Sequence, residues 1–273
     1  MRLQMWLSGL LPALGACLLL SACMTGAAVS EAGTSSARVS RDFASLPLGG
    51  GYVVSNNAWN RDAAHGPHEQ EIFRGLDGGT PVFGWQWRWP SGDGVVAYPE
   101  VIYGDTPWDR RPRGEVADLP LRLGSRGVTA DYDISFQSSG ICNLAFEFWA
   151  VSSLPASPAR ITHEVMIWID NNGMTPAGAW TDTFTLGDVT YDVFLRESHG
   201  DASGKNPQKW TYIAFLARRP VLKGPLDVGA FAAFLQSRKL LGNELYMTSL
   251  ELGNEVMTGT GRTEVRGYKI TIR

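Results

Sequence analysis

The chain has 273 residues, of which 44% are hydrophobic and 19% are charged, and its 31 Gly, 15 Pro and 10 Trp are typical of a globular domain rich in strands and turns. The formal net charge is −3 and no run of Lys and Arg exceeds two residues, which argues against nucleic acid as a partner, because phosphate binding needs a concentrated positive surface. No apolar run beyond the first 22 residues reaches the roughly 20 residues of a membrane helix.

Residues 1–22 are interpreted as a signal peptide that is removed from the mature protein. Arg2 precedes an apolar stretch from Met5 to Leu20, as in secretory signals. The closing Leu20-Ser21-Ala22-Cys23 resembles a bacterial lipobox, after which Cys23 would become the acylated first residue. An ordinary signal peptide, cleaved nearby at an Ala-rich site, is the alternative.

Residues 24–47 consist mostly of Ala, Ser, Gly, Thr and Val. This composition predicts a flexible tether between Cys23 and a domain over residues 48–273. We therefore expect an exported protein that is lipid-anchored to the bacterial cell envelope and otherwise makes no membrane contact. Met24 stands where an Asp would favour retention in the inner membrane, so we expect the outer membrane where the host has one.

Cys142 is predicted to be the one thiol of the mature domain, since cleavage removes Cys17 and acylation uses Cys23. It directly precedes an apolar strand, so we interpret it as a structural cysteine rather than a nucleophile. The four His residues are interpreted as surface residues, because their spacing does not match a zinc site.

From about residue 48, short apolar and aromatic segments alternate with clusters of Gly, Pro, Asn and Asp, which predicts antiparallel strands joined by turns. About 225 residues of this kind predict one sandwich or barrel. One helix is predicted from about Pro225 to Leu240, with Gly242 at its C-terminal stop. Its apolar side chains at helical spacing are Leu226, Phe231, Phe234, Leu235 and Leu241.

Four segments have a period of two that assigns alternate side chains to opposite faces of a sheet: 83–89, 144–149, 162–170 and 246–255. Three of them carry glutamate on one face. The side chains assigned to the core in these three are Leu144, Phe146, Phe148, Val165, Ile167, Ile169, Tyr246, Leu250 and Leu252. Those assigned to the opposite face are Ala145, Glu147, Trp149, Glu164, Met166, Trp168, Asp170, Ser249, Glu251 and Glu255.

A sheet face that carries both carboxylates and Trp side chains suits a polysaccharide, since sugar rings pack on indole and sugar hydroxyls bond polar neighbours. An exposed Trp otherwise sacrifices burial. In 83–89, Trp85, Trp87 and Trp89 share one face, and for them a plain core role is an equal alternative.

The segment His163-Glu164-Val165-Met166-Ile167-Trp168-Ile169 resembles the nucleophile strand of glycoside hydrolase family 12, and Asp170 to Gly178 resembles the loop that follows it. Four further segments resemble family landmarks in the family order. These are Asn56 to Trp59, Val96 to Val101 with Ala97 in place of the usual Ser, Ala145 to Trp149 with Glu147 in place of the usual Asp, and Gly253 to Gly259 with Met257 in place of an aromatic residue. The resemblance implies an all-β jelly-roll sandwich of two antiparallel sheets, with one short helix and a concave substrate groove.

It also implies a retaining mechanism with two carboxyl groups. Glu164 would be the ionised nucleophile, Glu255 the acid/base with the higher pKa, and Glu147 the carboxyl that supports the nucleophile. Asn57 and Trp59 would hold sugars in the minus subsites. The remaining predicted substrate contacts are Met166, which without the resemblance is a core methionine, Trp149, and Glu251, which is the rival of Glu255 for the acid/base role.

The implied function is endo-acting hydrolysis of β-1,4-glucans such as xyloglucan, mixed-linkage β-glucan or amorphous cellulose, without a metal or organic cofactor. The sequence carries no sign of the oligomeric state, and a monomer is the default expectation. A non-catalytic glycan-binding lipoprotein on the same fold is the alternative from another class. A xylanase of the neighbouring jelly-roll family is less well matched, because it lacks the Met-Ile-Trp strand.

Overall fold

A computed structural model describes residues 27–28, 35–108 and 116–273. The predicted signal peptide and Cys23 lie outside these residues. Within the described part, no helix has the length and apolar character to cross a bilayer.

The described residues are mostly strand, with one α-helix and short 3-10 turns at Arg61–Ala63 and Pro158–Arg160. The first strands are β1 (Ala27–Ala28), β2 (Ala37–Val39), β3 (Ser45–Gly49), β4 (Tyr52–Ser55), β5 (Glu69–Asp77), β6 (Thr80–Trp89), β7 (Glu100–Gly104) and β8 (Leu121–Arg122). The central strands are β9 (Val128–Val151), β10 (Ile161–Asn172), β11 (Ala179–Leu186), β12 (Val189–Gly200) and β13 (Lys209–Ala217). The last elements are β14 (Leu226–Asp227), α1 (Val228–Ser237), β15 (Tyr246–Met247), β16 (Ser249–Gly253) and β17 (Val256–Ile272).

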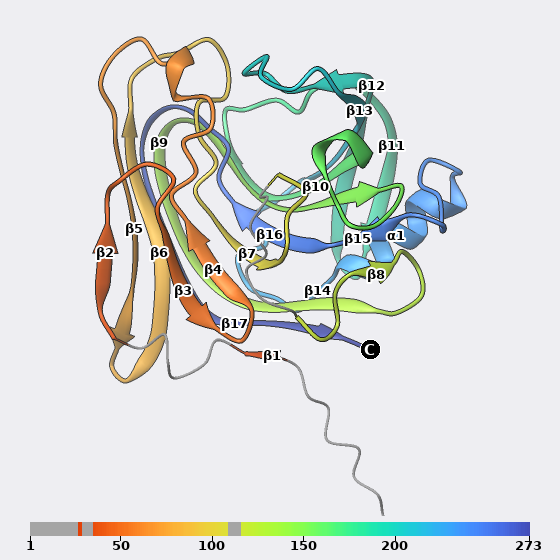
Figure 1. Cartoon of the computed structure of the whole chain (residues 1–273), viewed down its shortest axis with the longest axis horizontal. Helices are drawn as coiled ribbons and strands as arrows, with labels where there is room; N and C mark the ends of the chain where they lie inside the picture. Colours follow the sequence, from red (N-terminus) through yellow and green to blue (C-terminus); the bar gives the residue numbers. More distant parts are fainter. Residues whose placement is uncertain (1–26, 29–34, 109–115) are drawn as a thin grey trace, which may run out of the picture.

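The strands form two packed layers, as the resemblance implied (Figure 1). The outer layer has the order β2-β5-β6-β17-β9. The inner layer has the order β3-β4-β7-β16-β9-β10-β13-β12-β11. Its pairs are antiparallel except β10 with β13.

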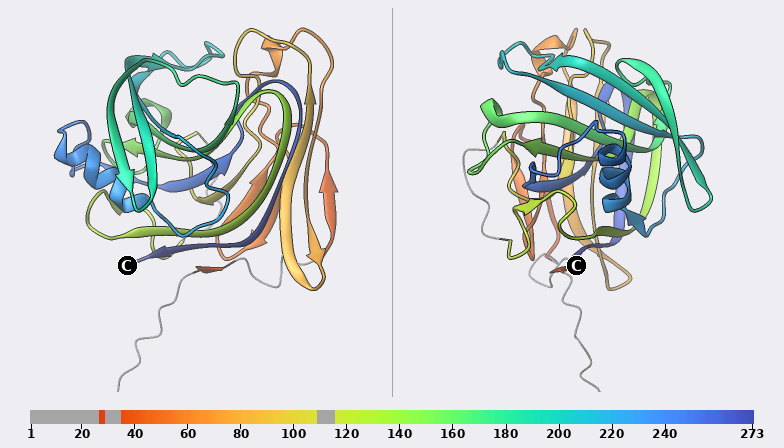
Figure 2. Two further views of the ribbon diagram at one scale, coloured as in Figure 1. Left: turned by 180° about the vertical axis from the view of Figure 1, so that it is seen from behind. Right: turned by 90° about the vertical axis from the view of Figure 1, so that its right-hand side faces the viewer.

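Strand β9 belongs to both layers, because it bends from one into the other together with β17 (Figure 2). Its first part, from Val128 to Cys142, pairs with β17, and its later residues pair with β10 on one side and β16 on the other. One continuous backbone therefore joins the outer layer to the centre of the inner layer.

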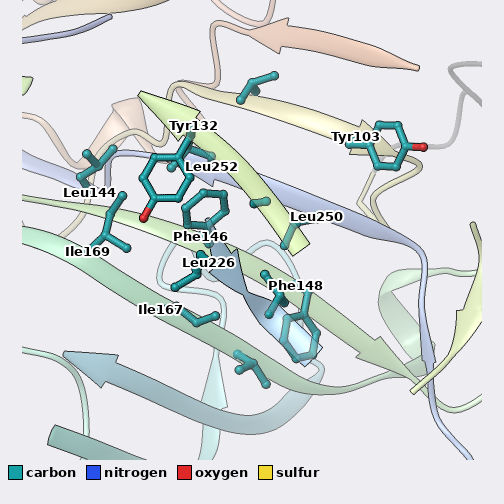
Figure 3. Packing of buried hydrophobic residues seen from close by; sticks show 14 of the residues in the cluster. Tyr103, Tyr132, Leu144, Phe146, Phe148, Ile167, Ile169, Leu226, Leu250 and Leu252 are labelled. Carbon is teal, nitrogen blue, oxygen red and sulfur yellow. The ribbon is translucent and has the colours of Figure 1, made fainter. Parts of the chain in front are cut away.

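The core fills the space between the layers, and the alternation in the sequence sorts its side chains correctly. Phe146 and Phe148 of β9, Ile167 of β10 and Leu250 and Leu252 of β16 pack together there (Figure 3). Their strand neighbours on the other side, among them Ala145, Met166 and Trp168, form a second cluster. The free thiol of Cys142 is fully buried among core residues, which fits a structural cysteine.

The three Trp side chains of β6 belong to the core, so the plainer alternative for Trp85, Trp87 and Trp89 is correct. Two of their indole N–H groups have buried acceptors. Trp85 Nε1 donates to Asn254 Oδ1 over 2.6 Å, and Trp89 Nε1 donates to Gln70 Oε1 over 2.9 Å.

The ordered fold begins before residue 48, the position at which the domain was predicted to begin after a tether. β2 pairs with β5, and β3 pairs with β4. Leu46 and Leu48 alternate into the core from β3. The average composition of residues 24–47 hides this short alternating segment, and the predicted boundary is therefore too late.

Helix α1 is shorter than predicted. Leu226 lies in β14, and Asp227 caps the helix by accepting a bond from the Ala230 amide over 3.1 Å. At the other end, Lys239 adopts φ = 58° and its amide bonds Gln236 O, while the Leu240 amide bonds Leu235 O. This is a Schellman ending. Lys239, and not Gly242, takes the left-handed position.

The alternation predicted across 246–255 is interrupted at Thr248, which separates β15 from β16. Met247 of β15 therefore enters the core. Tyr246, predicted to be inside, instead packs near Trp149 on the other face and lies under the Arg122 guanidinium.

Candidate active site

One row of side chains crosses the concave face of the inner layer at right angles to its strands. Residues that oppose each other on neighbouring strands project to the same face. The row runs through Ile102 of β7, Glu251 of β16, Glu147 of β9, Met166 of β10, Ala214 of β13 and Phe194 of β12. In this row Glu147 and Glu251, two of the predicted site residues, are cross-strand neighbours.

Glu164 lies two residues before Met166 on the same face of β10, between Trp149 of β9 and Tyr212 of β13. It is 7% exposed, and its Oε2 accepts a 2.6 Å bond from the indole N–H of Trp210. Burial raises the pKa of Glu164, the charge of Glu255 raises it further, and the Trp210 bond opposes both effects. No local sequence pattern marks Trp210 as a site residue.

Trp210 is itself fixed by other aromatic rings. Its ring meets that of Trp149 edge to face at 5.3 Å, and Trp108 meets both rings in the same manner at 5.0 Å from Trp149 and 5.7 Å from Trp210. The imidazole of His199 lies 5.9 Å from the Trp210 ring centre. Burial lowers the pKa of His199 to about 4, so this half-buried ring is neutral near pH 7 and is not the surface histidine expected.

Glu255 lies between β16 and β17, and Asn143 of β9 holds it. The Asn143 side-chain amide donates to Glu255 Oε2 over 2.5 Å, and its oxygen accepts the Glu255 backbone N–H over 2.8 Å. Asn254 in turn donates to the Asn143 carbonyl over 2.5 Å. Burial raises the pKa of Glu255 to about 7, against the lowering effect of the Asn143 bond.

The expectation that Glu255 has the higher pKa of the two is wrong for the unliganded site, where the pKa of Glu164 is raised to about 8 and that of Glu255 to about 7. Burial acts on Glu164 as well, so the pKa values of both groups are raised. The charge of Glu255 adds to the raised pKa of Glu164, so the titrations of the two carboxyl groups are linked. Near neutral pH the pair retains a proton that can be transferred to a leaving group.

Glu147 and Glu251 are cross-strand neighbours, and both are buried. Ser249 Oγ donates to Glu251 Oε1 over 2.8 Å. Burial raises the pKa of Glu147 well above its ordinary value, and the charges of Glu251 and Glu164 add to this effect. Like charges this close do not both ionise readily, so the charged form of Glu147 is disfavoured while Glu251 is charged.

The other predicted substrate contacts lie around this centre. Asn57 donates to Glu100 Oε1 of β7 over 2.9 Å, and Trp59 is half-buried against the second apolar cluster. Trp149 is buried among the aromatic rings around Trp210. Met166 is 1% exposed in the second cluster, which is the environment of a core methionine, the alternative that the sequence left open.

Across the described ranges, no group of three or more His, Cys, Asp or Glu side chains is arranged to hold a metal ion. The carboxyl groups themselves are suited to proton transfer and nucleophilic attack. Glu255 comes 91 positions after Glu164 in the chain and is close enough for its charge to raise the pKa of Glu164. A carboxyl pair of this kind can cleave a glycosidic bond.

Comparisons with known proteins agree with this geometry. The sequence profile of Glycosyl hydrolase family 12 matches residues 50–273. Endoglucanase S of Pectobacterium parmentieri is 29% identical over 97% of this chain and 95% of its own length. Xyloglucan-specific endo-β-1,4-glucanase A of Emericella nidulans is 24% identical over 82% of this chain and 86% of its own. The structure of a family 12 xyloglucanase from Bacillus licheniformis superimposes with a TM-score of 0.76 and 27% identity, covering 87% of this chain and all of that one.

Proposed function

Because the chain belongs to glycosyl hydrolase family 12, we propose that it cleaves internal β-1,4-glucosidic bonds of glucans with retention of the anomeric configuration. Its substrates are xyloglucan, mixed-linkage β-glucan and amorphous cellulose. The names of the relatives, an endoglucanase and a xyloglucan-specific endo-β-1,4-glucanase, support this class. The observation that carries the proposal is the burial of Glu164 and Glu255 at one site, where both carboxyl groups have raised pKa values and the charge of Glu255 acts on Glu164.

In the first step, a carboxylate oxygen of Glu164 attacks the anomeric carbon and the bond to the departing oxygen breaks. Glu255 gives its proton to that oxygen, which leaves as a hydroxyl group. In the second step, Glu255 takes a proton from water, the water oxygen attacks the anomeric carbon, and the bond to Glu164 breaks. Both carboxyl groups return to their starting states.

The neighbours of the two glutamates suit these roles. The indole N–H of Trp210 favours the ionised form of Glu164 before attack, and Asn143 holds the Glu255 carboxyl in one orientation. Glu147 acts as the supporting carboxyl of the nucleophile. Asn57, Trp59 and Trp149 bind sugar units, and no metal or organic cofactor takes part.

The test is release of reducing ends from xyloglucan, barley β-glucan, carboxymethylcellulose and xylan by the purified chain, with Glu164→Gln and Glu255→Gln as matched variants. We expect cleavage of at least one β-1,4-glucan and a loss of at least about a hundredfold in both variants. The product anomer, followed by NMR, should be β at first. A folded wild type that binds a glucan without cleaving it would establish the glycan-binding alternative.

We further propose that the chain is exported, lipidated at Cys23 and anchored to the envelope, in the outer membrane where one is present. The support is the pattern Leu20-Ser21-Ala22-Cys23 after an apolar segment. Labelled palmitate should enter the wild type and not Cys23→Ser, and the variant should leave the membrane fraction. Equal labelling of both would contradict the anchor. We also propose a monomer, which light scattering of the detergent-solubilised protein tests.

A further inference from the structure

Trp180 is the most exposed large apolar side chain of the described residues, at 58%. It lies on β11, the strand at the edge of the inner layer. An indole in water at this position gains nothing from the core. Single exposed apolar side chains are common on protein surfaces, so it is the setting of Trp180, and not its exposure alone, that points to a ligand.

A β-bulge turns Trp180 onto the concave face. Farther along β11, Phe184 opposes Tyr191 and Asp182 opposes Val193, and both partners point into the core. Simple alternation would send Trp180 to that same side. The register instead shifts between Trp180 and Asp182, so that Trp180 opposes Phe194. A bulge of this kind redirects a side chain to the other face of the sheet.

Phe194 closes the row of side chains that crosses the concave face through Met166, Glu147 and Glu251, and it packs against the second apolar cluster. Trp180 extends this row by one more strand. The exposed indole is therefore continuous with the carboxyl centre and is not an isolated surface residue.

The indole is also held in one orientation. Its Nε1–H donates to Asp192 Oδ1 over 3.3 Å, and the Arg218 guanidinium binds the same carboxylate over 2.7 Å. Asp192 opposes Leu216, another member of the concave side. A ring that is fixed before binding loses little conformational freedom when a ligand covers it. The apolar ring face and a flanking carboxylate together suit a sugar ring with its hydroxyl groups.

The distance from the carboxyl groups to Trp180 indicates which glucosyl unit of a bound chain would lie on the indole. β11 is the third strand beyond β10, and strands lie about 4.8 Å apart, so Trp180 is roughly 14 Å across the sheet from the nucleophile strand. A glucosyl unit of an extended β-1,4-chain is about as long as this strand spacing. Asn57 and Trp59 follow β4, which lies on the other side of the carboxyl groups.

We propose that Trp180 is a stacking platform for the glucan chain on the leaving-group side, roughly two or three units beyond the bond that is cut. This inference rests on the proposed hydrolysis of β-1,4-glucans. It makes Trp180 a binding residue for long substrates that takes no part in bond cleavage.

The test compares Trp180→Ala, Trp180→Phe and the control Leu76→Ala, which removes a 51% exposed apolar side chain from β5 in the outer layer. Each is assayed on polymeric glucan, on cellohexaose and on a short aryl cello-oligosaccharide whose aryl group is the leaving group. For Trp180→Ala we expect KM on the polymer to rise about three- to tenfold with kcat nearly unchanged. The cleavage pattern of cellohexaose should shift, and kinetics on the aryl substrate should not change. Trp180→Phe should keep most of the affinity, and Leu76→Ala should match the wild type.

Cleavage of the aryl substrate by the wild type tests the hydrolase function separately. Suppose that the wild type is active and that Trp180→Ala leaves KM on the polymer unchanged, or changes the kinetic constants on the polymer and on the aryl substrate equally. The stacking platform is then wrong, while the proposed hydrolase function is still supported. A change only in the mass of the protein in solution would assign Trp180 to contact with a second copy, and this too would overturn the platform. An inactive wild type would overturn both proposals.

Discussion

At the scale of single residues, the charge on Glu251 controls the two groups beside it. It opposes Glu147 across β9 and β16, and its charge raises the pKa of both Glu147 and Glu164. A glutamine at this position keeps the shape and removes the charge. We therefore expect Glu251→Gln to lower the pKa of Glu164, so that the acidic limb of the kcat/KM profile moves down by about half a unit to one unit.

The control is Ser249→Ala, which removes the hydrogen bond to Glu251 but leaves its charge in place. The acidic limb of the kcat/KM profile of Ser249→Ala should not move to lower pH. If Glu251→Gln abolishes activity at every pH while the protein stays folded, Glu251 is the acid/base after all and the role given to Glu255 is wrong.

Asn143 positions the other carboxyl group. Its side chain both donates to the Glu255 carboxylate and accepts the Glu255 amide. Asn143→Ala should lower kcat about ten- to a hundredfold with a smaller change in KM, because the proton donor loses its orientation. It should also move the basic limb of the profile to higher pH, since the Asn143 bond holds the pKa of Glu255 down. Asn172→Ala, which removes a similar half-buried amide bonded to Ser138, is the control and should change neither.

At the scale of elements, the end of α1 holds a left-handed residue that is not glycine. Lys239 is exposed and has φ = 58° in a Schellman ending. A side chain in this region costs about 1 kcal/mol. We expect Lys239→Gly to raise the free energy of unfolding by about 0.5–1 kcal/mol, measured by urea denaturation. Lys239→Ala keeps the backbone strain and should be close to the wild type. Equal stabilisation by both would contradict this account.

Irregular backbone explains why some side chains could not be placed from the sequence. Period-two alternation placed Glu147 and Glu164 on one face, because β9 and β10 pair in regular register from Glu164 to Trp168. Glu255, between β16 and β17, was selected by its resemblance to the family segment and not by a regular strand. The alternation failed for Tyr246, since Thr248 breaks the strand, and it did not reveal Trp180, since a bulge reverses the face. Asn143 and Trp210 were missed because their roles depend on contacts between distant strands. A lone Asn or Trp in a strand carries no local signal for such a contact.

At the scale of the whole molecule, the buried carboxyl groups make stability depend on pH. Their pKa values are raised in the folded state, to about 7 for Glu255, above an ordinary value of 4.5. The folded protein therefore binds more protons than the unfolded chain from about pH 5 to 8, and stability falls as pH rises through this window. We expect Tm to decline between pH 5 and 8, and Glu164→Gln to be more stable than the wild type at pH 8 by at least about 1 kcal/mol.

The same comparison at pH 5 is the control, because Glu164 is then protonated and resembles glutamine. The two proteins should differ little there. On the acidic side, Arg218 holds the pKa of Asp192 below its usual range, so this group loses its stabilising effect as pH falls through that range. A Tm that rises from pH 5 to 8, or a constant difference between the two proteins, would contradict the assignment.

The course of β9 through both layers also determines when the protein can become active during folding. Asn143 and Glu147 stand on the same strand whose beginning pairs with the C-terminal end of the chain, Val128 with Ile272. Contacts so distant in sequence form late and slowly. The reacting groups thus come together only after the last residues have been synthesised and paired. A chain cut short before β17 has no competent site, and the complete chain gains its site in one step, at the end of folding.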